Sequence, residues 1–93
     1  MHVELDELEI SILKCLLFTE SFERIVEECK VTDDKNIVAD GLKSLLKHKL
    51  VRPMNLKNGE FKSSIVYDSD KMHAFHYQAT AKGISWMEEN QLS

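Results

Sequence analysis

The sequence is poor in the residues that interrupt regular structure, with three glycines and one proline among 93 residues. These residues are isolated from one another, and no internal repeat, low-complexity segment or linker accompanies them. A chain of this length without a break in composition is expected to form one domain, here residues 1–93.

Cysteines and long apolar runs are also scarce. Cys15 and Cys29 are too few for the framework of a small secreted fold, which usually has four or six cysteines. We expect two reduced thiols, with a bridge between them as the less favoured alternative. No apolar run approaches the roughly 18 residues that a membrane span needs, and the opening MHVELDELEI is acidic where a secretion signal is basic. The sequence therefore predicts a cytoplasmic protein without a membrane segment.

Motifs for catalysis and for cofactor binding are missing as well. The sequence has no Gly-rich phosphate loop and no arrangement that marks a catalytic nucleophile. His73 and His76 lie three positions apart in a predicted strand, where they would point to opposite faces and could not share an ion. The cysteines match no zinc spacing. We expect no enzyme, no metal site and no cofactor.

Charge is distributed unevenly along the chain. Residues 1–34 contain three basic and ten acidic residues, whereas residues 35–62 contain seven basic and two acidic residues. The net charge of the whole chain is −4. A basic block inside an acidic protein indicates an anionic partner for the middle third; a dipolar surface that binds nothing is the alternative.

Hydrophobic periodicity predicts three helices in the first half of the chain. The first is expected over Leu5–Phe18 and the second from a Ser21 cap to about Cys29. The third is expected over residues 33–48, with Thr32 or Asp33 as its cap.

The third predicted helix is clearly amphipathic. Its apolar side carries Val38, Gly41, Leu42, Leu45 and Leu46, and its polar side carries Asn36, Ala39, Asp40, Lys43 and Lys47. Gly41 lowers helix propensity by about 1 kcal/mol relative to Ala. We therefore expect another helix to approach Gly41 closely.

Strand-like segments dominate the second half. Asn58-Gly59 is the strongest hairpin signal in the chain, and Pro53 predicts an edge position or a bulge for the strand that contains it. Thr80 is expected to cap a last helix. The strand candidates are Leu50–Leu56, Phe61–Tyr67 and Met72–Tyr77.

Two segments, VADGLKSLLKHKLV and YQATAKGISWM, resemble the winged helix-turn-helix domain of MarR- and PadR-like transcriptional regulators. The first is similar to the recognition helix and the hydrophobic pair before the wing, through Leu42, Leu45, Leu50 and Val51. The second is similar to the exit from the wing, through Tyr77, Thr80, Lys82 and Gly83. Lys49 stands where the family usually has Gly, and residues 60–71 exceed a minimal wing, so the subfamily stays open.

The resemblance implies an α+β fold with three helices, a small antiparallel wing sheet and a C-terminal helix. It also implies a transcriptional regulator that binds double-stranded DNA, with helix 33–48 in the major groove and a basic wing beside it. Asn36 is the best candidate for a base contact, because Asn pairs with adenine. The expected DNA-binding residues are Lys35, Asn36, Lys43, Lys47, Arg52, Lys57 and Lys62.

Two further expectations concern protein partners. Asp33, Asp34 and Asp40 lie on or beside the proposed reading helix and repel phosphate, so a winged helix that binds protein without nucleic acid is the alternative function. Surplus apolar side chains on the first and last helices predict a two-fold homodimer, with Ile10, Leu17 and Trp86 in its interface. Alternatively, these side chains cover one another within one subunit.

Overall fold

A computed structural model describes residues 4–64 and 70–90, and within them the chain forms four α-helices, one 3-10 helix and a four-stranded antiparallel sheet. In chain order the elements are α1 (Glu7–Cys15), β1 (Glu20–Ser21), α2 (Phe22–Glu28), α3 (Lys35–Lys47), β2 (Val51–Lys57), β3 (Glu60–Ser63), η1 (Met72–Ala74), β4 (His76–Ala79) and α4 (Ala81–Glu89). This confirms the predicted α+β class. No helix in these ranges is both long and apolar enough to cross a bilayer.

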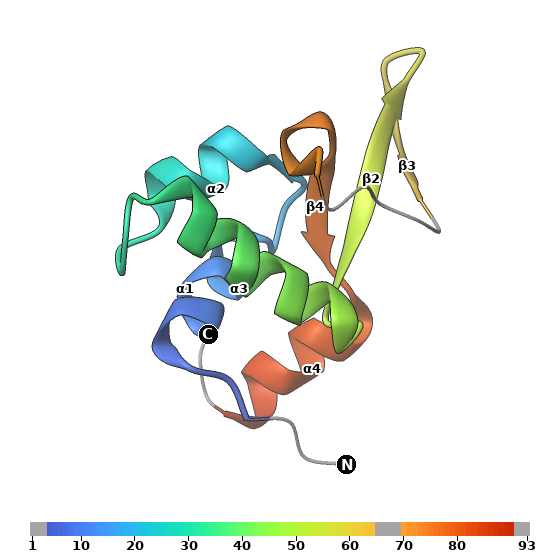
Figure 1. The fold of residues 1–93 in the computed structure, drawn as a ribbon. Coiled ribbons are helices and arrows are strands. Elements are labelled where there is room, and N and C mark those ends of the chain that lie inside the picture. Colours follow the sequence, from blue (N-terminus) through green and yellow to red (C-terminus); the bar gives the residue numbers. More distant parts are fainter. Residues whose placement is uncertain (1–3, 65–69, 91–93) are drawn as a thin grey trace.

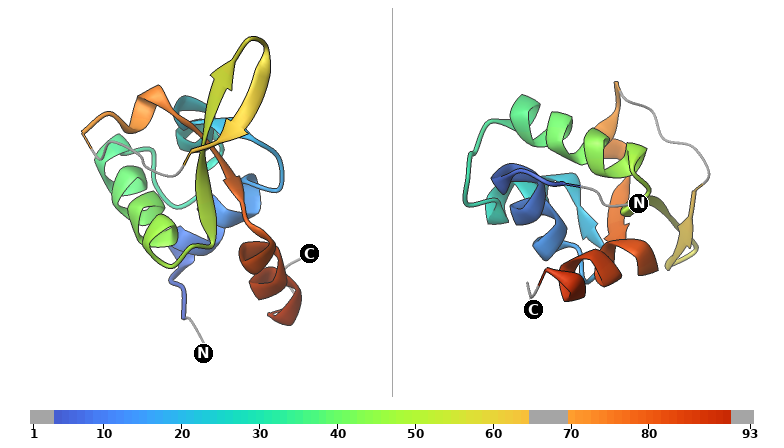
Figure 2. Two further views of the ribbon diagram at one scale, coloured as in Figure 1. Left: turned by 90° about the vertical axis from the view of Figure 1, so that its right-hand side faces the viewer. Right: turned by 90° about the horizontal axis from the view of Figure 1, so that it is seen from below.

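The β2–β3 hairpin projects beyond the helices, and α4 lies at the opposite end of the sheet (Figure 1). Helices α1, α2 and α3 cluster on one side of the molecule, as the views in Figure 2 show. The core between helices and sheet includes Ile12, Leu13, Leu16, Ile25, Val38, Leu42, Leu45, Leu50 and Tyr77, all at 0% exposure.

Helix α1 is shorter than the predicted Leu5–Phe18. Asp6 caps it, accepting from the Glu9 backbone N–H, while the Glu9 side chain accepts from the Asp6 backbone N–H. Because of this reciprocal cap, the helix begins at Glu7, two residues after the predicted start at Leu5. The helix ends at Cys15, and the carbonyl of Leu16 accepts a hydrogen bond from Ala79 instead. Leu17 therefore lies in a turn and not on the helix.

Helix α3 begins at Lys35 because Asp34 is its cap, not Thr32 or Asp33 as predicted. One oxygen of Asp34 accepts from the backbone N–H groups of both Asn36 and Ile37. The predicted apolar side is confirmed, since the buried positions of this helix are Val38, Gly41, Leu42, Leu45 and Leu46.

The close approach expected at Gly41 is also confirmed. A Cβ at this position would lie 2.9 Å from the Ile12 side chain and 3.0 Å from that of Leu8, both on α1. Nearby, the Ser44 hydroxyl donates a 2.6 Å hydrogen bond to the Glu9 carboxylate. The contact between α1 and α3 thus combines tight packing with one partly buried polar bond.

The end of α3 explains why Lys49 can replace the usual glycine. The Leu50 N–H donates to the Leu45 carbonyl and the Lys49 N–H to the Leu46 carbonyl, which is the Schellman arrangement. This motif needs a left-handed residue at position 49, and Lys49 adopts a φ of 62°. Leu45 and Leu50 are both fully buried, so both ends of this hydrogen-bonded turn are anchored in the core.

The sheet has the strand order β1-β4-β2-β3. The Asn-Gly hairpin is confirmed, because Asn58 and Gly59 both have positive φ and join β2 to β3. The expectation that Pro53 marks an edge strand or a bulge is wrong, since β2 lies between β4 and β3 and its pairing with β4 runs without interruption through Pro53. Pro53 accepts a bond from Ser64 through its carbonyl, so its missing N–H faces the end of β3 and removes no bond to β4.

Other strand predictions need correction. The two-residue β1 was not foreseen; it pairs Glu20 with Tyr77 and Ser21 with His76. The candidate Met72–Tyr77 divides into η1 and β4, because the Tyr77 hydroxyl bonds to the Met72 carbonyl at 2.6 Å and folds that segment back. Within the predicted strand Phe61–Tyr67, β3 ends at Ser63, and residues 65–69 lie outside the described residues.

The segment TAKG joins α4 to the end of α3. Thr80 accepts from the Gly83 N–H and donates to the Lys49 carbonyl at 2.8 Å, and the ammonium of Lys82 donates to the His48 carbonyl. Gly83 lies directly against the Leu50 backbone. The residues that resemble the wing exit therefore fasten α4 to the chain between α3 and β2, through these hydrogen bonds and the close packing of Gly83.

Candidate nucleic-acid interface

One stripe of polar residues runs along the outward side of α3. At 3.6 residues per turn, Asn36, Asp40, Lys43 and Lys47 fall within about 60° of one another. Asn36, Asp40 and Lys47 are exposed and Lys43 is half-buried. From residue 36 to residue 47 the stripe is roughly 16 Å long, which matches about four or five base-pair steps of a duplex.

A hollow of about 220 Å³ opens along the first half of this stripe. Its walls come from α3, from Phe22 of α2 and from Asp70, Met72 and His73. The charged and polar side chains around it are Lys35, Asn36, Asp40, Lys43, Asp70 and His73.

His73 was not among the residues predicted for this surface. The sequence pattern predicts a strand at His73, whereas this residue lies in η1 and is exposed beside α3. No local pattern could have indicated this neighbourhood, because residues 36 and 73 are far apart in the sequence and border the same hollow only in the folded chain.

The hairpin adds basic residues on one face. Cross-strand partners share a face of a sheet, and faces alternate along a strand. Lys57 and Asn55 therefore lie on the same face of β2 as Pro53 and Val51, which are buried. Lys62 of β3 lies on this face too, because it is the cross-strand partner of Asn55. Both lysines are thus on the face of the sheet that packs against the core at Val51 and Pro53, but they lie further along the hairpin, where this face is exposed.

Arg52 does not join these lysines. It lies at an alternate position of β2, on the outer face, and donates a 3.4 Å hydrogen bond to Gln78 of β4. The predicted DNA-binding residues therefore divide into a helix group (Lys35, Asn36, Lys43, Lys47), a hairpin group (Lys57, Lys62) and a separate Arg52.

The cations of the helix and hairpin groups are unpaired within the part of the chain that the structure describes. There, every ion pair involves Arg24, which contacts Glu20, Glu27 and Glu28. The basic groups of α3 and the hairpin are therefore available to an anion, while Asp40 places a carboxylate in the middle of the stripe on α3.

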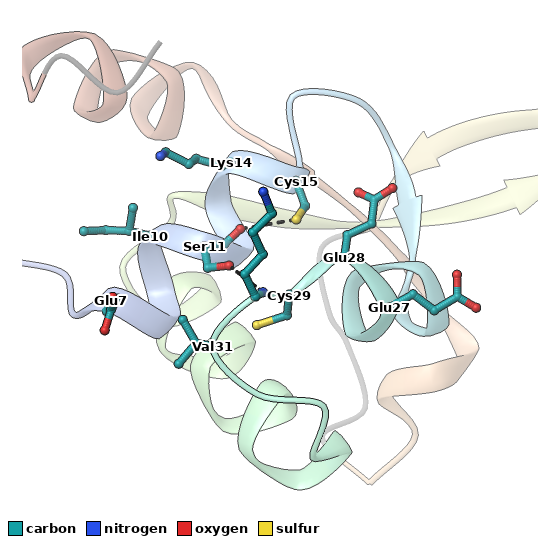
Figure 3. A pocket seen from close by; sticks show the side chains of 10 residues that line it. Glu7, Ile10, Ser11, Lys14, Cys15, Glu27, Glu28, Cys29 and Val31 are labelled. Atoms are coloured by element: carbon teal, nitrogen blue, oxygen red, sulfur yellow. Dashed lines mark hydrogen bonds between the residues drawn. The ribbon is translucent and has the colours of Figure 1, made fainter.

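A second, larger hollow of about 660 Å³ lies between α1 and the end of α2 (Figure 3). Cys15 and Cys29 both line it, together with Ser11, Glu28 and Lys30. Both cysteines are free thiols, as predicted. Burial, followed by the nearby Glu28, raises the pKa of Cys15 to about 11, and its thiol donates to the Ser11 carbonyl at 3.2 Å. A thiol held in its protonated form is a poor nucleophile and a poor metal ligand.

Across residues 4–64 and 70–90, no three side chains of His, Cys, Asp or Glu gather as a metal ion would require. The three predicted interface residues have different environments. Leu17 is 50% exposed, Ile10 is half-buried beside the larger hollow, and Trp86 of α4 is only 9% exposed within the single chain.

Neither models of protein families, nor curated proteins, nor solved structures gave a match to this chain. Its function has to follow from the geometry and charge of its own surface.

Proposed function

We propose that this protein is a winged-helix regulator that binds double-stranded DNA, with α3 in the major groove and the β2–β3 hairpin on the neighbouring backbone or minor groove. The observation that carries the proposal is the absence of ion pairs at the basic residues of the α3 stripe and of the projecting hairpin, within the part of the chain that the structure describes. A helix fits the major groove, which is about 12 Å wide, and α3 presents a polar stripe along its free side.

The order of elements supports the winged-helix assignment. Three helices precede a hairpin whose tip is clear of the body, and a short β1 pairs with the last strand of the sheet. The hairpin of β2 and β3 is then the wing, and α3 is the recognition helix.

Each basic group has an expected role. Lys57 and Lys62 of the hairpin contact phosphates, which sets the register of the protein on the duplex without reading sequence. On α3, Asn36 reads a base and Lys43 and Lys47 reach guanine or phosphate. Arg52, on the outer face of the sheet, takes the smallest part because it is turned away from the two groups.

We also propose that the protein acts as a homodimer built from α1 and α4. Leu17 and Phe18, in the turn after α1, are 50% and 77% exposed, and Ile84 of α4 is 37% exposed. With Trp86 buried in its own subunit, these are the large apolar side chains that remain exposed on α4 and in the turn after α1. A two-fold dimer would place two reading helices on two half-sites.

A protein-binding winged helix is the second candidate, and a specific feature of the hairpin favours it. Leu56 and Phe61 are cross-strand partners and are 55% and 43% exposed on the face opposite to Lys57. An exposed apolar pair at the tip of a hairpin is a natural contact for another protein.

Fluorescence anisotropy of labelled duplexes with a random central region separates the two candidates. At low salt the DNA proposal expects saturable binding that weakens steeply as salt is added. If the folded protein does not bind these duplexes, the DNA proposal is wrong and the protein-binding candidate replaces it.

A further inference from the structure

Asp40 has no role in the fold that the structure can account for. It lies in the interior of α3, where Asp is a poor helix former, and its side chain is exposed. Among the described residues it makes neither a hydrogen bond nor an ion pair, and it is not the cap of the helix, which is Asp34.

The position of Asp40 is nevertheless central to the proposed interface. It lies on the same stripe as Asn36 and Lys43, and all three border the smaller hollow. A carboxylate here repels the phosphates that the surrounding lysines attract, so it lowers general affinity for DNA. A carboxylate that weakens contact with the DNA backbone but faces the duplex is suited to accepting a hydrogen bond from a base.

The neighbour of Asp40 defines which base pair fits. Lys43 lies three residues further along the helix, and the Cβ atoms of such pairs are about 5–6 Å apart. The pair therefore offers an acceptor and a cationic donor side by side. No ion pair joins the two side chains, so each is free to meet its own partner.

A C·G pair has the complementary pattern in the major groove. Cytosine presents its N4 amino donor, and guanine presents O6 and N7 as neighbouring acceptors. In an A·T pair the adenine amino group is flanked by acceptors, N7 on its own base and O4 of thymine, so a carboxylate placed on it would also face them. The Asp-Lys pair thus matches C·G better than A·T.

We infer that Asp40 and Lys43 together read one C·G base pair, with Asp40 accepting from cytosine N4 and Lys43 donating to guanine O6 or N7. This inference rests on the proposed function and makes Asp40 a determinant of specificity.

The test begins with selection of preferred sites by the wild-type protein from duplexes with a random central region. The selected site is expected to contain a C·G pair whose replacement by T·A weakens wild-type binding about tenfold. In Asp40→Asn the same replacement should weaken binding less than twofold. Circular dichroism and the melting temperature confirm that this exposed substitution leaves the fold intact.

Lys57→Gln is the matched control. It removes a charge from the hairpin, so it should weaken binding to every duplex while keeping the tenfold preference for C·G. Two results would overturn the inference in distinguishable ways. If Asp40→Asn binds all duplexes more tightly and keeps the wild-type preference, Asp40 only repels phosphate and DNA binding itself stands. If the wild type binds no duplex, the proposed function fails and the inference fails with it.

Discussion

Gly83 of α4 packs directly against the carbonyl oxygen of Leu50, so closely that a Cβ at position 83 would overlap it. The atom that would be displaced belongs to the backbone between α3 and β2. Leu50 is held there from both sides, because its N–H donates to Leu45 and its carbonyl accepts from Thr80. The contact between α4 and Leu50 therefore cannot accommodate a larger side chain at position 83 unless the backbone moves.

Gly83→Ala is expected to reduce the free energy of unfolding by at least about 2 kcal/mol, because an overpacked site must move backbone atoms. Urea denaturation measures the change. Gly41→Ala is the matched control, since it is also a glycine within a helix. There the added methyl group meets the movable ends of Leu8 and Ile12, and the gain in helix propensity of about 1 kcal/mol offsets much of the cost. Equal losses in the two variants would contradict this explanation.

Lys49→Gly is expected to stabilise the protein by up to about 1 kcal/mol. Lys49 occupies the left-handed region, which costs a non-glycine residue roughly 1–2 kcal/mol, while glycine loses part of that gain through its more flexible unfolded chain. Lys47→Gly removes the same side chain from inside α3 and should instead destabilise by about 1 kcal/mol. Chemical denaturation of both variants checks the opposite signs.

The hairpin lysines should control the salt dependence of DNA binding. If Lys57 and Lys62 each neutralise one phosphate, each change to Gln should reduce the slope of log affinity against log salt by about one. Lys14→Gln, on α1 beside the larger hollow, should leave the slope unchanged. Titrations at several salt concentrations supply the slopes, and an equal effect at all three lysines would indicate a general charge effect without a defined interface.

Cys15 should react slowly with iodoacetamide near neutral pH and much faster in strong alkali. With a pKa of about 11, roughly one thiol in a thousand is ionised at pH 8, and only the thiolate reacts. Peptide mapping should show a rate that rises about tenfold per pH unit up to this pKa, and far faster labelling at pH 8 in the unfolded chain. Between pH 9 and 11 the Cys15 thiol ionises in the unfolded chain but stays largely protonated in the folded protein. Its contribution to the free energy of unfolding is therefore lost as pH rises through that range. A rate at pH 8 equal to that of the unfolded chain would refute the raised pKa.

Assembly is best tested at Leu17. Sedimentation equilibrium at micromolar concentration should show a dimer for the wild type and a folded monomer for Leu17→Glu, because the half-exposed side chain would place a charge in the interface. Trp86→Lys is unsuitable, since Trp86 is buried within one subunit and its replacement tests folding. A monomer mass for the wild type would exclude the dimer.

The sequence by itself determined the elements whose signals are local. The apolar side of α3 was readable because its residues repeat at helical spacing, and the Asn58-Gly59 turn because few residues tolerate positive φ at both positions. The cap at Thr80 was also predictable from local sequence, because its hydroxyl accepts a hydrogen bond from an N–H only three residues away.

Tertiary structure alone decided what depends on contacts between distant residues. Pro53 is tolerated inside the sheet because β3 ends beside it, and Trp86 is buried because α4 is clasped to the end of α3 by Thr80 and Lys82. The separation of Arg52 from the hairpin lysines follows from strand register. A periodicity in the sequence shows that a residue faces a core, but the partner it meets there is set by the packing of the whole chain.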